Sequence, residues 1–568
     1  MNGYVPADRN HVKTIWSALL ICCAAMVFGR AIPSLLLMGQ EPPTKTAGAT
    51  APGASSGVSG SSDAGTICMR ALQEGIKNFR AENFKAAALS LETAVAVHAS
   101  GPPTAHAYAW LARTYLHLHR VSDAEDASQK AVDTGKELAN AQTALAEVYF
   151  REGKMAEAEH VLLGLVKNQS ATPRTYLGLA NIHWATANYK SARTLIELAH
   201  KDDTSDPDIR ESWMRSLTPR ERVEEWKRRL AEGKYEDDQE RQGLAAGIAV
   251  AEDRRKNENR SCKLLNKLNA TQTKLVQHML DPHRYSSYDL GVKLNGVNAQ
   301  LELDTGAGGI LVSSRIAEKA GLAKVADNLI GGIGDKGAAK GYVAFADKLQ
   351  IGELEFQNCY VDVVDKKRAL DVDGLIGADV FENYLIDIDF PNSMLRLSQL
   401  PPYPDQTGEQ TSLESEQTVS AGLHDRWVPP QYKDFETVYR FGHMLLLPVQ
   451  LNKAPYRLFL LDTGAWDNTL SPAAAREASK LHKDYDLKVK GLSGEVQTVY
   501  TTGEVMLTFG RFRQKRSDLV AFDLSNMSNH IGTEVSGALG FAMLYLLDIK
   551  LDYRDNLVDF EYDPNRFH

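Results

Sequence analysis

The chain contains one short motif twice, an apolar run that ends in Asp-Thr-Gly-Ala, at Leu301–Ala307 and again at Leu458–Ala465. An apolar run bounded by glycine predicts a buried strand that ends in a tight turn. A carboxylate at the end of such a strand is partly desolvated, so its pKa is open to large shifts. The two aspartates, Asp304 and Asp462, are therefore the first candidates for chemistry.

Each motif is followed by the same further landmarks in the same order. They are a Gly-rich turn (Gly331–Gly334 and Gly491–Gly494), a Gly-apolar-apolar-Gly segment (Gly374–Gly377 and Gly537–Gly540), and a Tyr-Leu-apolar-Asp-Ile segment (Tyr384–Ile388 and Tyr545–Ile549). The final half of the chain is therefore one unit of roughly a hundred residues, the size of a small domain, written twice. An internal repeat of this kind governs the fold prediction.

This order of parts resembles the retropepsin-like aspartic peptidases, which combine Asp-Thr-Gly-Ala, a glycine-tipped flap, and two apolar residues with a glycine before a short helix. The resemblance covers about residues 285–568. Ala307 and Ala465 match the retropepsin pattern, since pepsins usually have Ser there. The resemblance implies two mostly-β, barrel-like lobes in one chain, with the active site between them.

The resemblance also implies an endopeptidase in which Asp304 and Asp462 share one proton and activate a water molecule, without a metal or cofactor. The proton belongs to the pair, so acid and base are not assigned separately. The loops that support the pair are Thr305, Gly306, Ala307, Thr463, Gly464 and Ala465. The threonine hydroxyls are expected to lock these loops. Alanine in place of a hydroxyl removes one donor to each aspartate, which favours work nearer neutral pH.

The flap role falls to the two glycine-rich turns, which would close over substrate and exclude water. The flap and substrate-contact candidates are Gly332, Ile333, Gly334, Leu492, Ser493 and Trp466. Trp466 follows Ala465, whereas Gly308 stands at the same point of the first copy. Trp466 either forms a specificity pocket or blocks the cleft. Because the two flaps differ, the lobes are expected to contact substrate differently.

Three alternatives to the peptidase stay open. In the first, Asp-Thr-Gly is only a turn with a structural aspartate. In the second, the chain is a catalytically inactive peptidase-like binding or scaffold protein. In the third, each copy pairs with the same copy of another chain. The linker predicted at 399–436, rich in proline and acidic residues, makes pairing within one chain easy because it keeps the lobes at high effective concentration.

Residues 67–207 show apolar side chains at helical spacing. Four predicted second helices each carry an alanine near their start, at Ala87, Ala124, Ala158 and Ala192, spaced 37, 34 and 34 residues apart. This period resembles tetratricopeptide repeats. The resemblance implies an α-solenoid whose groove binds a peptide or a partner protein. A plain spacer or bundle stays open.

The remaining segments are predicted to link these domains or to direct their export. Residues 208–282 are predicted as charged connecting helices, with an inhibitory pro-segment as an alternative. The lobes then occupy 283–398 and 437–568. Residues 1–39 hold a basic start and an apolar run, predicted as a signal anchor, with a cleaved signal peptide or a buried helix as alternatives. Residues 40–66, rich in Pro, Gly and Ser, are predicted as a flexible linker.

The net charge of −9 and the lack of a basic, aromatic stripe argue against a nucleic-acid partner. Beyond Cys22 and Cys23, the cysteines fall one to a region, at Cys68, Cys262 and Cys359, so no disulfide framework is predicted. Motifs for zinc, phosphate or a serine nucleophile are absent from the sequence. The sequence thus predicts a multidomain, extracytoplasmic aspartic endopeptidase of bacterial type. It is expected to be membrane-anchored or secreted and to act on proteins or peptides.

Overall fold

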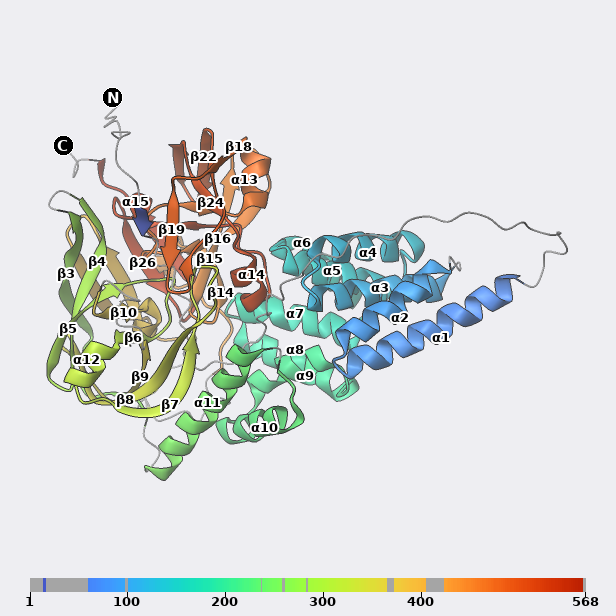
Figure 1. The fold of residues 1–568 in the computed structure, drawn as a ribbon, viewed down its shortest axis with the longest axis horizontal. Helices are drawn as coiled ribbons and strands as arrows, with labels where there is room; N and C mark the ends of the chain where they lie inside the picture. The colour runs from blue at the N-terminus through green and yellow to red at the C-terminus, as the bar shows by residue number, and fades with distance from the viewer. Residues whose placement is uncertain are drawn as a thin grey trace, which may run out of the picture. The chain divides into compact units, whose positions relative to one another are not determined.

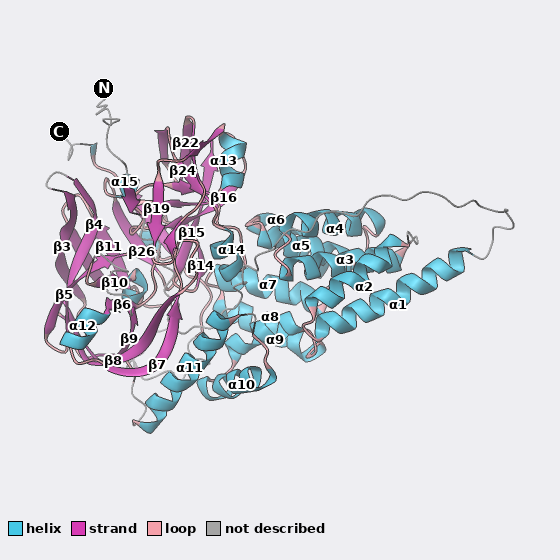
Figure 2. Ribbon diagram, viewed as in Figure 1, coloured by secondary structure: helices cyan, strands magenta, loops and turns pink. Residues whose placement is uncertain are grey.

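The computed structural model describes residues 14–16, 60–97, 101–235, 237–257, 261–281, 284–364, 372–404 and 423–564. Helices fill the N-terminal part of this range and strands the C-terminal part (Figure 2). The chain forms two compact units. In the described residues, one unit (Ala31–Ile182 with Ala192–Arg215) is helical and the other (mainly Ser216–His568) is rich in strands.

The repeat region consists of eight consecutive helices that pair along the chain (Figure 1). They are α1 (Gly60–Arg80), α2 (Phe84–Ala96), α3 (Pro102–His117), α4 (Val121–Thr134), α5 (Ala139–Arg151), α6 (Met155–Lys167), α7 (Pro173–Ala185) and α8 (Tyr189–Asp202). The alanines that mark the repeat, at positions 87, 124, 158 and 192, are fully buried. A small side chain there lets the helix axes approach closely. The predicted helical repeats are confirmed.

Helix α1 begins at Gly60, so the predicted linker 40–66 is wrong at its end. The apolar side chains of this helix, Cys68, Leu72 and Phe79, are buried in the repeat core. Once such a face fixes the helix, each further residue adds one backbone hydrogen bond at little cost, which extends the helix toward its N-terminus.

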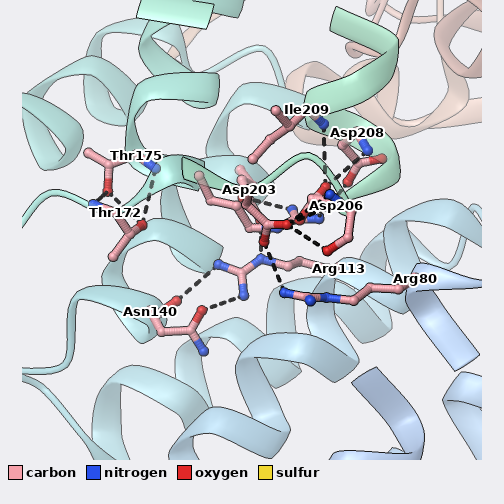
Figure 3. A network of polar contacts seen from close by, with 12 residues as sticks. Arg80, Arg113, Asn140, Thr172, Thr175, Asp203, Asp206, Asp208 and Ile209 are labelled. Atoms are coloured by element: carbon pink, nitrogen blue, oxygen red, sulfur yellow. Dashed lines mark hydrogen bonds and ion pairs between the residues drawn. The ribbon is translucent and has the colours of Figure 1, made fainter. Parts of the chain in front are cut away.

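Buried charges link successive repeats of the helical unit (Figure 3). The Arg113 guanidinium, almost fully buried, donates to Glu147 at 2.7 Å and to the Asn140 side chain at 2.6 Å. One repeat further along, Arg174 donates to Asp206 at 2.7 Å and also to Glu147 at 3.1 Å. Arg174 also donates to Asp208 at 2.8 Å, and Asn140 lies 2.9 Å from His106, so side chains one repeat, 34 residues, apart contact each other.

The connecting region is helical only as far as Lys256. It contains α9 (Pro207–Trp213), a 3₁₀ turn η1 (Met214–Ser216), α10 (Pro219–Glu232) and α11 (Asp238–Lys256). Helix α11 packs on β7 (Ala323–Ile330) of the first lobe (Figure 1). The helix prediction for 208–282 is wrong beyond this point, because β2 (Lys263–Leu264) and β3 (Ala270–Asp281) follow. Strand β3 pairs with one neighbouring strand over Ala270–Lys274 and with another over Leu275–Asp281, so ladder hydrogen bonds select the extended form although most of its side chains are not buried.

The two lobes repeat the same strand connections. The strands of the first lobe are β4 (Arg284–Leu294), β5 (Val297–Leu303), β6 (Ile310–Ser313), β7 (Ala323–Ile330), β8 (Ala339–Ile351), β9 (Leu354–Val364) and β10 (Gly374–Ile376). Those of the second are β14 (Tyr439–Phe441), β15 (Met444–Leu451), β16 (Tyr456–Leu461), β17 (Thr469–Leu470), β18 (Leu481–Asp484), β19 (Lys488–Gly491), β20 (Gly494–Glu495), β21 (Val499–Thr502), β22 (Val505–Phe509), β23 (Phe512–Arg516), β24 (Val520–Phe522) and β25 (Gly537–Leu539). In each lobe the strand before the aspartate lies parallel to a three-residue strand, and that strand lies antiparallel to the strand after the motif.

Short helices fill the remaining connections of this unit. They are α12 (Ser314–Lys319), η2 (Ala378–Phe381), η4 (Pro430–Tyr432), α13 (Pro472–Ala478), α14 (Ser525–Ile531) and α15 (Phe541–Leu544).

One sheet runs through both lobes and joins them within one chain. The strands of this sheet that link the lobes are β3, β12 (Met394–Gln399), β11 (Tyr384–Asp389), β26 (Asp548–Asp552), β27 (Leu557–Glu561) and β13 (Glu436–Thr437). The repeated Tyr-Leu-apolar-Asp-Ile segments pair with each other here, with Ile388 opposite Ile549. The main apolar core continues from one lobe to the other. The described parts of the predicted linker 399–436 pack on the second lobe, where Arg554 donates to the Pro401 carbonyl.

A disulfide joins Cys262 and Cys359, so the prediction of no disulfide is wrong. The two cysteines stand 97 residues apart in the sequence. Antiparallel pairing of β2 with β9 brings their Cα atoms to 4.2 Å. Cysteine spacing could not reveal this pair, since only the strand pairing makes the two residues neighbours.

Within the described ranges, no helix is long and apolar enough to cross a membrane. The predicted signal or anchor at 1–39 and most of the linker at 40–66 lie outside the described residues. The exception is β1 (Thr14–Trp16), a short strand that pairs in parallel with β19.

Candidate active site

Asp304 and Asp462 stand directly after β5 and β16, and both side chains are fully buried. Each backbone N–H donates to the neighbouring three-residue strand, Asp304 to the Ile376 carbonyl at 3.0 Å and Asp462 to the Leu539 carbonyl at 3.1 Å. The backbone hydrogen bonds of each strand therefore extend as far as the aspartate and fix the position of its Cα atom.

One oxygen of each carboxylate is held by its own loop. The Oδ1 atom of Asp304 accepts from the N–H groups of Gly306 and Ala307 at 2.8 and 3.1 Å, and that of Asp462 accepts from Gly464 and Ala465 at 3.0 and 2.9 Å. In the described part of the chain, the Oδ2 atom of each aspartate has no hydrogen-bond donor from the protein. The loops thus fix both carboxylates and leave one oxygen of each for chemistry.

The two threonines bind the loops to each other across the lobes. The Thr305 hydroxyl accepts from the Thr463 N–H at 3.0 Å and donates to the Leu461 carbonyl at 2.7 Å. The Thr463 hydroxyl accepts from the Thr305 N–H at 3.0 Å and donates to the Leu303 carbonyl at 2.7 Å. The sequence predicted that these hydroxyls hold the loops, and the structure places them in a reciprocal pair.

The motif glycines allow the two carboxylates to approach. A Cβ atom on Gly306 would lie 2.9 Å from the Asp462 carboxyl carbon, and one on Gly464 would lie 2.4 Å from that of Asp304. Each glycine therefore faces the aspartate of the other lobe at a distance that no other residue allows. Glycine is needed here for close packing.

Burial raises the pKa of both aspartates, and the facing Asp462 raises the pKa of Asp304 further. Two buried carboxylates this close cannot both carry a charge at low cost. The arrangement therefore favours a pair that holds one shared proton over a wide pH range.

The two predicted flaps meet at their tips. The Ser493 N–H donates to the Ile333 carbonyl at 2.9 Å, and the Lys336 N–H donates to the Ser493 carbonyl at 2.8 Å. Gly334 has φ +128° and packs against the Gly494 backbone, so a side chain there would clash. Leu492 is buried in an apolar cluster of the first lobe with Leu311, Ile330 and Leu375. The candidates from the two glycine-rich turns, which include Gly332 beside Ile333, therefore come together.

Trp466 and Gly308 occupy equivalent positions with different surroundings. Trp466 is half-buried against the main core. Gly308 lies under His443, a residue that the sequence prediction missed, and a Cβ on it would lie 2.6 Å from the ring. The His443 Nε2 atom lies 3.2 Å from the Gly306 carbonyl, and desolvation lowers the pKa of this histidine to about 4. The unusual Gly308 was the only hint of this contact in the sequence.

Two protein-family models match parts of the chain. Residues 290–380 and 447–542 match the aspartyl protease model, and residues 72–139 and 143–207 match a tetratricopeptide repeat model. The UBA domain-containing protein Mud1 of Schizosaccharomyces pombe is 31% identical over 111 residues, which are 19% of this chain and 32% of that protein. The chain thus covers about a third of that relative's length. A retropepsin-like aspartic protease from Rickettsia conorii aligns at 21% identity and TM-score 0.17, over 23% of this chain and 96% of that one.

Proposed function

The chain carries two retropepsin-like aspartyl protease domains behind tetratricopeptide repeats, and we propose that it is an aspartic endopeptidase with Asp304 and Asp462 as its catalytic pair. The reciprocal bonds of Thr305 and Thr463 carry the proposal, because they bring both carboxylates to one place within one chain. A structural aspartate in an ordinary turn has no need of a second lobe.

The chemistry follows from one proton on two buried carboxylates. The ionised carboxylate takes a proton from a water molecule while the protonated carboxyl donates its proton to the scissile carbonyl oxygen. The water oxygen bonds to the carbonyl carbon and gives a neutral tetrahedral intermediate. The protonated carboxyl then gives its proton to the leaving nitrogen while the ionised carboxylate takes a proton from one hydroxyl of the intermediate, so the C–N bond breaks, the new carboxyl group forms, and the pair again holds one proton. No covalent enzyme intermediate forms.

The flaps are the part of the site that would close over a bound substrate. Their tips are joined by backbone hydrogen bonds between Ile333 and Ser493. For a substrate chain to enter, these hydrogen bonds between the flap tips would have to break. The backbone of the bound substrate would then offer new hydrogen-bond partners to the flaps. Closure over the substrate would exclude bulk water and strengthen the electrostatic effect of the carboxylates.

We propose that the repeats bind a protein or peptide partner, since stacked repeats present an extended concave surface. The expected result is that a protein substrate is cut with a lower KM than a short peptide that contains the same scissile site. Equal KM values for the protein and the short peptide would indicate that the repeats do not bind substrate and act only as a spacer.

The disulfide between Cys262 and Cys359 supports an extracytoplasmic location, because such bonds persist in oxidising compartments. If native protein is treated with an alkylating reagent without reduction, mass spectrometry should find neither Cys262 nor Cys359 alkylated. The N-terminal anchor, the secreted alternative and the bacterial source stay predictions.

The test uses the full chain, incubated with a mixed peptide library between pH 3 and 8, with cleavage read by mass spectrometry. Asp304→Asn and Asp462→Asn are compared with Asp347→Asn, an exposed aspartate of the first lobe. We expect both active-site variants to lose all cleavage and the control to keep it. Activity that survives in one variant indicates that like copies pair between chains. A folded wild-type chain that cuts nothing is a binding or scaffold protein.

A further inference from the structure

The face of β5 that lies away from the core carries a carboxylate two residues before Asp304. Along this strand Leu301 and Leu303 belong to the main core, so Glu302 points to the opposite face, as does Asp304 after it. Glu302 is nevertheless buried, with 7% of its surface exposed. A buried glutamate beside a catalytic pair needs a reason, since an uncompensated buried carboxylate is costly.

Neighbouring strands place two more side chains on this face. In the β-ladder Glu302 stands opposite Asp289 of β4 on one side and Leu375 of β10 on the other. Directly opposite residues share a face. Leu375 packs with Leu492 of the flap, so this face lies beneath the flap. The row therefore lies next to the catalytic pair, where a substrate side chain would sit.

The second lobe has an apolar row in the same register. Leu460 stands two residues before Asp462, opposite Leu446 of β15 and Ala538 of β25. All three are buried. The two rows are equivalent in backbone position, so the acidic row of the first lobe is a difference of side chains alone.

The acidic row has few cations to balance it. The Asp289 Oδ2 atom lies 3.3 Å from the Nδ1 atom of His278, which is part-exposed on β3. Its other oxygen, Oδ1, is buried and has no hydrogen-bond partner among the described residues. Asp304 and Asp462 are near enough to interact electrostatically with Glu302. Burial and the charge of Asp289 raise the pKa of Glu302 to about 7, although the Ser287 hydroxyl and the charge of His278 act in the opposite direction.

We propose that Glu302 and Asp289 form a subsite that receives a lysine or arginine side chain of the substrate, while Leu460 and Leu446 receive an apolar side chain across the scissile bond. This inference rests on the proposed peptidase function. A guanidinium or ammonium would supply donors to Glu302 and to the Asp289 Oδ1 atom and would neutralise the row. The substrate class is then a peptide with one basic and one apolar residue beside the bond.

The test compares matched peptides that differ at one residue beside the scissile bond: Lys, Arg, Met or Glu. With the full-length wild-type chain, we expect kcat/KM for Lys and Arg to exceed that for Met by about 100-fold, and Glu to be cut least. In Glu302→Gln and in Asp289→Asn the Lys-to-Met ratio should fall toward one. The control Asp347→Asn should keep the wild-type ratio.

Two results would overturn the subsite. One is a wild-type chain that cuts without preference for a basic residue. The other is a Glu302→Gln variant that slows every peptide by the same factor, which would make Glu302 an electrostatic neighbour of the catalytic pair and no subsite residue.

Binding separates failure of this inference from failure of the proposed function. The Asp462→Asn full chain, which cannot cut, is titrated by calorimetry with the Lys and Met peptides, and Glu302 is then also changed to Gln. Tighter binding of the Lys peptide that disappears with Glu302→Gln supports the subsite even if no cleavage is ever seen. Equal binding of both peptides rejects it.

Discussion

The two lobes share backbone connections and loop chemistry but differ in the side chains beneath the flaps. Both place an aspartate after a strand, hold it with two N–H groups, and present a threonine hydroxyl to the other lobe. The row beside the aspartate is acidic in the first lobe and apolar in the second. The two lobes are therefore alike in the loops that hold the carboxylates and different in the row of side chains beside them.

The lobes also differ in how they are reinforced. The first lobe carries the disulfide between Cys262 and Cys359 and is covered by α11, whose Asp253 accepts from the Tyr360 hydroxyl at 2.8 Å. In the described residues the second lobe has no disulfide. The first lobe is therefore expected to resist local opening better than the second.

The largest expected effect comes from adding a methyl group between the aspartates. Gly464→Ala and Gly306→Ala should each lower kcat/KM at least about 100-fold, because a small misplacement of reacting groups is enough for such a loss. Gly464→Ala should lower kcat/KM more than Gly306→Ala does. The Cβ atom at position 464 would lie 2.4 Å from the carboxyl carbon that it faces, whereas the Cβ atom at position 306 would lie 2.9 Å from the one that it faces. Steady-state kinetics on a cleaved peptide measures both. Gly164→Ala, in open space on α6, is the control.

Removing the disulfide should weaken the first lobe selectively. Cys262→Ser with Cys359→Ser should lower the free energy of unfolding by about 2–4 kcal/mol, because the bond closes a long loop. Hydrogen exchange should rise in β2 and β9 more than in β16. Equal increases in both lobes would contradict the idea that the first lobe is separately reinforced.

The threonine pair should show symmetry between the lobes. Thr305→Val and Thr463→Val should each lower the free energy of unfolding by about 1–3 kcal/mol, since each leaves buried partners unsatisfied. The double variant should lose less than the two single losses combined, because the hydroxyls belong to one network. Urea denaturation measures this, with Thr508→Val as a half-exposed control. Strict additivity would contradict the reciprocal arrangement.

The smallest effect concerns pH at the sheet shared by the lobes. Burial and the nearby Asp387 raise the pKa of Asp548 to about 7. The native state thus keeps a proton that the unfolded chain releases, so stability falls as pH rises from about 4 to about 7. Because this side chain is part-exposed, Asp548→Asn should gain only about 1 kcal/mol at pH 8 over wild type. Urea denaturation at pH 4.5 and 8 checks this, and an equal gain at both values would reject the shift.

The sequence predicted elements where short-range pattern decides them. The 34-residue alanine period predicted the repeats, and the twin Asp-Thr-Gly-Ala motif predicted two lobes. It failed at β3, whose polar residues show no strong alternation and whose extended form depends on two neighbouring strands. It failed also at the disulfide, which needs the pairing of β2 with β9.

The candidate site divides in the same way. The aspartates and the loop residues stand together in the chain, so the motif alone names them. Glu302 lies inside that motif, yet its surroundings come from Asp289 on another strand and from a flap of the other lobe. The identity of a strand follows from local period and turns, whereas its register follows from which face is buried against distant strands. The sequence therefore determined which carboxylates are catalytic candidates, and only the tertiary structure decided which side chains surround them.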